Sequence, residues 1–329
     1  MHALKKYTWQ EELSNIITDP AELLRQLALD TSLLEAAYAA VRLFPLKVTR
    51  SYLARMRVGD VNDPLLRQVL PLGAELTESS QYGLDPLGEA KVNPIAGLLH
   101  KYHGRVLVTL TSACAIHCRY CFRRHFPYSE NNPGREGWEK IFAYVANDMS
   151  LREVILSGGD PLAVSDGMLQ AFTDRLAMIP HVDTLRIHSR LPIVLPQRVT
   201  SELLTWIRGI KQSVVIVVHA NHPQEINTEV RDALLSLRDA GAHVLNQAVL
   251  LQGVNDNVAT LVALSEILFA AGTLPYYLHV LDKVKGAAHF DLPIESARDL
   301  HAELTRRLPG YLVPRLVRED AGQASKTLL

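Results

Sequence analysis

The sequence contains very little cysteine and few aromatic residues. Only three of its 329 residues are cysteine, and phenylalanine, tryptophan and tyrosine together make up 6%. The three cysteines fall within one stretch of eight residues, which is too cramped for a disulfide framework. We therefore interpret them as thiols of a reducing compartment and as candidate ligands.

The sequence also lacks an excess of charge of one sign and a long apolar run. Its formal net charge is -1 at pH 7, so no global positive field exists to attract nucleic acid or anionic lipid. No run of about eighteen apolar residues occurs, and no apolar segment follows the lysines near the amino terminus. We expect a cytoplasmic protein that acts on small molecules or protein partners, with neither nucleic acid nor membrane among them.

Apolar residues are plentiful, at 48%, and they follow two different patterns. Helix-like spacing, as in Leu13, Ile16 and Ile17, predicts a mainly helical amino-terminal extension over residues 1–100. Farther on, short β-branched runs alternate with amphipathic stretches, which predicts six β-α units and a parallel sheet in a barrel or in an open doubly wound form. The predicted strands are 105–111, 153–157, 184–189, 213–219, 243–250 and 276–281.

Polar and reactive side chains follow the ends of these predicted strands. Cys114 comes after the first strand and Asp160 after the second, while His219 ends the fourth and Asp282 follows the sixth. The carboxyl ends of parallel strands meet on one face of a sheet. We therefore expect these side chains to share one site.

Cys114, Cys118 and Cys121 have C-x3-C-x2-C spacing, and the sequence has no fourth cysteine. Three thiolates on so short a loop can bind three corners of an iron-sulfur cube and leave one iron open, whereas a ferredoxin ordinarily supplies four cysteines. A zinc site completed by His117 or His125 is also possible. The alternative to an enzyme is therefore a structural iron-sulfur or zinc binding module.

The cysteine spacing resembles the signature of the radical S-adenosylmethionine superfamily. The resemblance implies a 4Fe-4S cluster whose open iron binds S-adenosylmethionine and whose electron cleaves it to a 5'-deoxyadenosyl radical. The turn Ser157-Gly158-Gly159-Asp160 resembles the superfamily's glycine-rich motif for the methionine amino group. Taken alone, Asp160 before Pro161 is more typical of a helix N-cap.

Four further segments, 120–124, 189–198, 221–225 and 246–255, all resemble the lysine 2,3-aminomutases. The resemblance covers roughly residues 85–329. This family has a partial (β/α)6 barrel, which implies a barrel core over residues 101–293 and a carboxyl-terminal segment over 294–329. It also implies isomerase activity and pyridoxal 5'-phosphate as a further cofactor.

The resemblance assigns the cofactor-binding residues. Lys326 matches the lysine that holds pyridoxal phosphate, although the family's preceding glycines are mostly replaced and a lysine so placed is otherwise typical of a frayed tail. Arg105 matches an arginine at the cofactor phosphate, and Tyr102 is expected beside the ring. His219 and Gln247 match positions that line the S-adenosylmethionine pocket, with a core histidine as the alternative for His219.

The resemblance also assigns the substrate-binding residues. Arg123 matches the residue that pairs with the carboxylate of lysine, and Asp282 and Glu319 match two acids that hold its distal ammonium. Two acids suit one buried ammonium, because an unpaired buried charge is costly. Asp320 is the alternative to Glu319, and His279 stands where the family typically has a tyrosine.

Segments 98–103 and 121–128 and the short ending after Ser325 resemble the branch of the family that serves (R)-β-lysylation of elongation factor P. This implies conversion of (S)-α-lysine to (R)-β-lysine, which a separate ligase attaches to elongation factor P. An electron donor is a further expected partner, and a homodimer is the expected assembly. The alternative is a catabolic lysine 2,3-aminomutase, although the additional zinc-binding cysteines of that group are missing.

Overall fold

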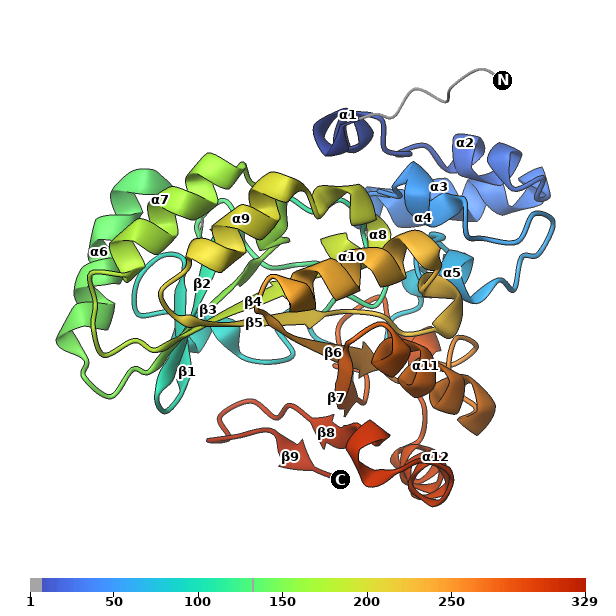
Figure 1. The fold of residues 1–329 in the computed structure, drawn as a ribbon. Coiled ribbons are helices and arrows are strands. Elements are labelled where there is room, and N and C mark those ends of the chain that lie inside the picture. The colour runs from blue at the N-terminus through green and yellow to red at the C-terminus, as the bar shows by residue number, and fades with distance from the viewer. Residues whose placement is uncertain (1–7, 132) are drawn as a thin grey trace.

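Within residues 8–131 and 133–329, the part of the chain that the computed structural model describes, one nine-stranded sheet carries the fold (Figure 1). Its strands lie in sequence order, with β2 to β8 parallel and the edge strands antiparallel to their neighbours. The strands are β1 (Leu98–Tyr102), β2 (Arg105–Thr111), β3 (Glu153–Gly158), β4 (Thr184–Ser189), β5 (Ser213–Val218), β6 (His243–Val249), β7 (Leu274–His279), β8 (Arg315–Arg318) and β9 (Thr327–Leu328).

Helices connect each pair of neighbouring parallel strands from β2 to β8, which confirms the six predicted β-α units. In Figure 1, α6, α7, α9 and α10 cover one face of the sheet. The connecting helices are α6 (Gly134–Asn147), α7 (Asp166–Leu176), α9 (Ser201–Gly209), α10 (Thr228–Asp239), α11 (Val258–Ala270) and α12 (Ile294–Arg307), with the short α8 (Leu191–Val194) ahead of α9.

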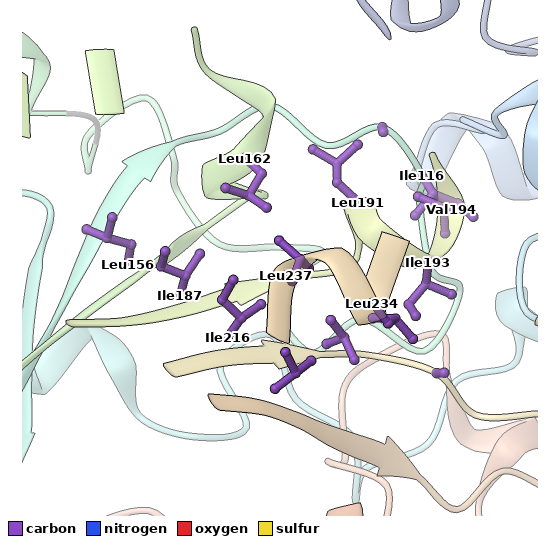
Figure 2. Packing of buried hydrophobic residues seen from close by; sticks show 14 of the residues in the cluster. Ile116, Leu156, Leu162, Ile187, Leu191, Ile193, Val194, Ile216, Leu234 and Leu237 are labelled. Carbon is purple, nitrogen blue, oxygen red and sulfur yellow. The ribbon is translucent and has the colours of Figure 1, made fainter. Parts of the chain in front are cut away.

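The alternation of side chains along each strand separates the core from the opposite face of the sheet. Leu156, Ile187 and Ile216 are cross-strand neighbours in β3, β4 and β5, and all three are fully buried. Figure 2 shows them near Leu162 and Leu237, in the apolar cluster beneath the helices. The residues that alternate with them in these strands face the other side, where they are free to line a site.

The amino-terminal part is built from short helices that begin at good capping residues. Thr8 and Glu11 form a capping box at the first helix, and Asp19 and Asp63 cap helices that start with proline. Buried side chains of this part belong to the same core cluster as the sheet. The helices are α1 (Trp9–Ser14), α2 (Pro20–Gln26), α3 (Leu34–Leu43), α4 (Arg50–Leu53) and α5 (Pro64–Arg67).

The six predicted strands are confirmed to within two residues at each end. Strands β1, β8 and β9 were not among the predictions, and β1 begins inside the predicted extension, at Leu98. Residues 1–7 of that extension lie outside the described residues. No described helix combines the length and the apolar character that crossing a membrane requires.

Candidate active site

A cavity of about 570 Å³ lies against the sheet, and residues of β2, β3, β4, β6, β7 and β8 line it. Every site residue assigned from the sequence lies in the lining of this one cavity, although these residues come from distant parts of the chain. These residues are Tyr102, Arg105, Cys114, Cys118, Cys121, Arg123, Ser157, Gly158, Gly159, Asp160, His219, Gln247, Asp282, Glu319 and Lys326.

Two glycines hold the start of the cysteine loop, which we define as residues 112–124, against the end of β3. The amides of Gly159 and Asp160 donate to the carbonyls of Thr111 and Ala113, each at 2.7 Å. A Cβ on Gly158 would lie 2.5 Å from the Thr111 oxygen, and one on Gly159 would lie 2.4 Å from the Ala113 oxygen. Gly158 also has a φ of +111°, which disfavours other residues. The close backbone approach therefore requires glycine at both positions.

Asp160 is confirmed as an N-cap, and its carboxylate joins two turns. One oxygen accepts hydrogen bonds from the Leu162 amide at 3.0 Å and the Ser189 hydroxyl at 2.7 Å. The other accepts from the amides of Arg190 and Leu191, at 2.8 and 3.0 Å. Asp160 thus fixes the turn after β3 to the turn after β4 and shapes the wall of the cavity beside the cysteines.

The three thiols have the chemistry of cluster ligands. Burial and the neighbouring Cys121 raise the pKa of Cys114, and burial and Cys118 raise the pKa of Cys121 to about 12. Thiolates crowded in this way need a strongly cationic group to stabilise them. In the described part of the chain, no three His, Cys, Asp or Glu side chains converge as ligands of a single metal ion. In a 4Fe-4S cluster each cysteine binds a different iron. Three cysteines can therefore hold such a cluster although they do not meet around one metal ion.

The amino-terminal part supports the cysteine loop directly. Its backbone carbonyls at Lys47 and Gln68 accept from the amides of His117 and Arg119, at 3.0 and 2.9 Å. The Gln68 side chain also accepts from Arg190 Nη2 at 2.7 Å, while Nη1 of that arginine donates to Cys118. The cysteine loop is therefore wedged between the sheet and the amino-terminal helices.

A buried charge network lies under the same loop. The Glu75 carboxylate accepts from Nε and Nη2 of Arg119, at 2.8 and 2.6 Å, and from Nη2 of Arg124 at 2.8 Å. All three side chains are fully buried in these ion pairs. One carboxylate is paired with two guanidinium groups, so the network has a net positive charge. This charge would stabilise the cysteines of the loop in their thiolate form.

Four charged side chains form a second functional unit, the lysine group: Lys101, Asp282, Glu319 and Lys326. Glu319 accepts from Lys101 Nζ at 2.7 Å through one oxygen and from Lys326 Nζ through the other. Burial opposes ionisation of Glu319, but the two ammonium groups outweigh it and lower its pKa to about 2. Burial and the charge of Glu319 raise the pKa of Asp282 to about 7.

Buried polar atoms near the lysine group lack partners among the described residues. They are Nε2 of His188 and Nε2 of His279, both on residues that line the cavity. Arg105 lies against the Tyr102 ring, 4.7 Å from its centroid, and no described acid pairs with it. Buried polar atoms are ordinarily hydrogen-bonded. These residues fit a polar, anionic ligand with an aromatic ring, such as pyridoxal phosphate.

His219 has a partner within the protein. Its Nε2 lies 3.1 Å from Nε2 of Gln247, and its ring packs edge-on against His188. Burial and the charge of Arg190 lower the pKa of His219 to about 3, so it is neutral at physiological pH. A neutral histidine and an amide are suited to hydrogen-bonding a polar ligand without adding charge.

Arg123 contacts two side chains of the cavity wall. Nε and Nη2 donate to Glu89 at 2.8 and 2.6 Å, and Nη1 donates to Ser157 Oγ at 3.0 Å. Sequence reasoning missed Glu89 and Lys101. Lys101 precedes the predicted Tyr102 and so had a local signal, whereas nothing in the pattern around Glu89 indicated a site.

Comparison with known proteins gives consistent results. A family model described as a 4Fe-4S single cluster domain matches residues 103–183. The L-lysine 2,3-aminomutase of Escherichia coli strain K12 is 48% identical over 98% of this chain and 94% of that protein. The L-lysine 2,3-aminomutase of Haemophilus influenzae is 42% identical over 98% of this chain and 96% of that protein.

More distant relatives were also found. The L-lysine 2,3-aminomutase of Clostridium subterminale is 36% identical over 97% of this chain and 77% of that protein. Among solved structures, a radical SAM methyltransferase from Sphaerobacter thermophilus is 18% identical with a TM-score of 0.40, over 69% of this chain and 72% of that one.

Proposed function

Because the chain belongs to the L-lysine 2,3-aminomutase family, we propose that it converts (S)-α-lysine to (R)-β-lysine by moving the amino group from C2 to C3. The family consists of isomerases that use a 4Fe-4S cluster, S-adenosylmethionine and pyridoxal phosphate. The observation that carries the proposal is that one cavity collects the three cysteines, Lys326, Arg123 and the acids Asp282 and Glu319. When bound, the cofactors supply a 5'-deoxyadenosyl radical and an aldehyde that holds the migrating nitrogen.

The cysteine loop would hold the cluster, with Cys114, Cys118 and Cys121 on three irons. The backbone from Ser157 to Gly159 borders the cysteines, and it would contact the methionine part of S-adenosylmethionine. His219 and Gln247 line the same cavity and would contact the remainder of that cofactor. Asp160 would act on this site by fixing its turn, since its oxygens are already occupied.

The lysine group and its neighbours would hold pyridoxal phosphate and the far end of the substrate. Lys326 Nζ would bind the aldehyde, and Arg105 would bind the phosphate. The Tyr102 ring, which packs against Arg105, would lie beside the ring of this cofactor. Asp282 and Glu319 would bind the distal ammonium of lysine, for which the ionised Glu319 supplies charge throughout the physiological pH range.

Arg123 would bind the substrate carboxylate at the other end of the molecule. Its position on the cysteine loop ties substrate orientation to cluster geometry, because both depend on the same backbone segment. Recognition at both ends would hold C3 of lysine at a fixed place, and a displacement of about 1 Å can cost about a hundredfold in rate.

The proposal includes a finer description of the architecture. The six β-α units would form a partial (β/α)6 barrel of the radical SAM type over residues 101–293. Residues 1–100 would be its helical extension, and residues 294–329 would be the segment that carries the cofactor lysine. The parallel sheet from β2 to β8 and its six connecting helices support this description.

In the cell, we propose that the (R)-β-lysine is passed to a ligase that modifies elongation factor P. The chain spans 94 to 96% of its relatives from Escherichia coli, Haemophilus influenzae and Buchnera aphidicola, but only 77% of the Clostridium subterminale enzyme. The segments 98–103 and 121–128, which resemble that branch of the family, support this role. A cytoplasmic location, an electron donor and a homodimer are parts of the same proposal.

Anaerobic turnover of L-lysine tests the proposal. Reconstituted protein would be incubated with S-adenosylmethionine, pyridoxal phosphate and dithionite, and the amino acids separated by chiral chromatography. (R)-β-lysine should accumulate, should be lost in Cys118→Ala, and should persist in the exposed control Lys211→Ala. Transfer of the product to elongation factor P by its ligase, read by mass, tests the cellular role. The (S) product would favour catabolism, and absence of β-lysine from fully loaded protein would refute the proposed activity.

A further inference from the structure

Glu89 occupies one edge of the Arg123 guanidinium. Both residues line the cavity and both are less than one-tenth exposed. The two carboxylate oxygens of Glu89 accept from Nε and Nη2, and Ser157 accepts from Nη1. The pair is thus bidentate, which fixes the plane of the guanidinium as well as its position.

The contacts leave part of the guanidinium free. An arginine side chain carries five N–H donors, and the three hydrogen bonds to Glu89 and Ser157 use one on each nitrogen. Glu89 takes the edge formed by Nε and Nη2. The edge formed by Nη1 and Nη2 keeps a second donor on Nη2, and a substrate carboxylate can approach there without displacing Glu89.

We infer that Glu89 is a positioning residue that holds Arg123 by one edge so that its other edge meets the carboxylate of the substrate. This inference rests on the proposed function and names a residue that sets its substrate specificity. Lysine would then be distinguished from molecules that lack the carboxylate because Arg123 cannot rotate to adapt to them.

The backbone around Glu89 is fixed in place. Gly88 has a left-handed conformation, with a φ of +65°. The Asp85 carboxylate accepts from the amides of Glu89 and Ala90, at 2.9 and 3.2 Å. A short turn capped in this way presents the Glu89 side chain from a constrained position, as a positioning role requires.

The segment that carries Glu89 is also tied to the far end of the substrate site. The Tyr82 hydroxyl donates to Asp291 at 2.6 Å. Gly83 exchanges two backbone hydrogen bonds with Lys283 and Lys285, at 3.0 and 2.8 Å, directly after Asp282. Residues 82–89 therefore connect the loop of the ammonium-binding acid to the carboxylate-binding arginine, so they set the spacing between the two.

Glu89 has two opposing effects that an experiment can separate. Its charge disfavours a second carboxylate beside Arg123, whereas its bidentate contact orients the arginine. If orientation dominates, Glu89→Gln and Glu89→Asp should both weaken recognition of the carboxylate. The amide nitrogen of glutamine donates and cannot accept at one of the two contacts, and the shorter aspartate cannot reach both. If charge dominates, Glu89→Gln should strengthen recognition and Glu89→Asp should leave it unchanged.

The test compares the affinities of L-lysine and L-lysinamide. Anaerobic protein loaded with cluster, S-adenosylmethionine and pyridoxal phosphate, without reductant, would be titrated while the absorbance of the bound pyridoxal phosphate is followed. The wild type should prefer lysine, and this preference should fall about tenfold in both Glu89 variants. In a separate turnover assay with dithionite, kcat of these variants should be lowered more than KM is raised. Glu78→Gln, which removes an exposed ion pair with Lys285, is the control and should keep the preference.

The possible outcomes are distinguishable. A preference that is unchanged or increased in the Glu89 variants, or equal weakening of both ligands, would overturn the inference. If Glu89→Gln fails to fold, as judged by its thermal transition, Glu89→Asp retains the charge and gives the answer alone. Failure of the wild type to respond to lysine at all would instead refute the proposed function, and this would be known before any variant is made.

Discussion

The cysteine loop and the lysine group line the same cavity but are stabilised in different ways. The loop is held by the protein on several sides, through the Asp160 amide, which donates to the Ala113 carbonyl, and through the buried Glu75 network. The lysine group consists of charges that face each other, and no described residue donates a hydrogen bond to the Asp282 carboxylate. One part of the site is therefore organised before ligands bind, and the other is completed by them.

The two parts also differ in their buried nitrogen and oxygen atoms that lack a hydrogen-bond partner. Unpaired buried groups cost free energy, so a folded protein retains them where a ligand will pair with them. Nε2 of His188 and Nε2 of His279 lie beside the lysine group, and no nitrogen or oxygen of the described residues pairs with them. On the loop side the unpartnered atoms in the described part of the chain are Nε of Arg124 and of Arg190, and the other nitrogens of both guanidinium groups are hydrogen-bonded. Substitutions should accordingly have separable effects on the two parts.

The largest expected effect is that of Lys326→Ala. Turnover should fall by roughly four orders of magnitude, the scale of losing a covalent catalytic residue. The absorbance of lysine-bound pyridoxal phosphate should disappear while the iron and sulfide content stays at the wild-type level. Loss of iron in this variant would contradict the independence of the two parts.

Glu75→Gln should instead lower the iron content and leave the absorbance of lysine-bound pyridoxal phosphate in the protein that stays folded. Removing one partner of a buried ion pair costs about 3–5 kcal/mol, and here two arginines would lose their counter-charge. The melting temperature and the iron content should both fall. Glu139→Gln removes an ion pair between exposed side chains and should change neither. Wild-type iron content in Glu75→Gln would show that the amino-terminal part does not support the loop.

Gly159→Ala should have a smaller effect of the same kind. Its methyl group would lie 2.4 Å from the Ala113 oxygen, and overpacking of this kind costs about 1–3 kcal/mol. Iron should be bound more weakly, as a chelator titration would measure. Gly167→Ala is the matched control, because a Cβ there meets nothing within 4 Å. Equal iron retention in both variants would argue against the close approach.

The smallest expected effect is the pH dependence of lysine binding. Asp282 has a pKa of about 7, so its charge appears only as the pH rises through 7. Affinity for lysine should rise up to about tenfold per unit below pH 7 and level off above it. Glu319 and His279, with pKa values of about 2 and 3, do not titrate in this window. Calorimetric titration of Asp282→Asn should show no such rise.

The raised pKa of Asp282 makes lysine binding stronger as the pH rises, but it makes the folded protein less stable. A carboxyl whose pKa is raised by folding is protonated in the folded chain and ionised in the unfolded one between about pH 4 and 7. The contribution of Asp282 to stability therefore falls as the pH rises through that window. Asp282→Asn should melt at a higher temperature than the wild type at pH 8, which differential scanning calorimetry would measure.

Much of the fold was predictable because its signals are local. The six strands with β-branched runs were found, whereas β8, of four residues, and β9, of two, are too short to show a period. β1 was hidden because it pairs antiparallel at the edge of the sheet, next to a segment interpreted as helical. Local periodicity does not reveal such edge strands, whose pairing is fixed by tertiary contacts.

The site residues were predictable only where a motif or a family position marked them. Glu75, Glu89 and Gln68 escaped because each acts on a residue far away in the sequence, and a single buried acid or amide leaves no periodic signal. Conversely, Asp160 was assigned to a cofactor by its motif, while its hydrogen bonds give it a structural role that its N-cap pattern had also indicated.

The contacts of Lys47 and Gln68 with the cysteine loop have a consequence for how the enzyme matures during synthesis. These carbonyls belong to the part of the chain that leaves the ribosome first, and the loop follows soon after. Lys326 is made after nearly the whole sheet and is placed by β9, which pairs with β8 only when both have been synthesised. A nascent chain would therefore complete the cysteine loop before Lys326 is in place, so a cluster held by this loop would be loaded before a cofactor held by Lys326.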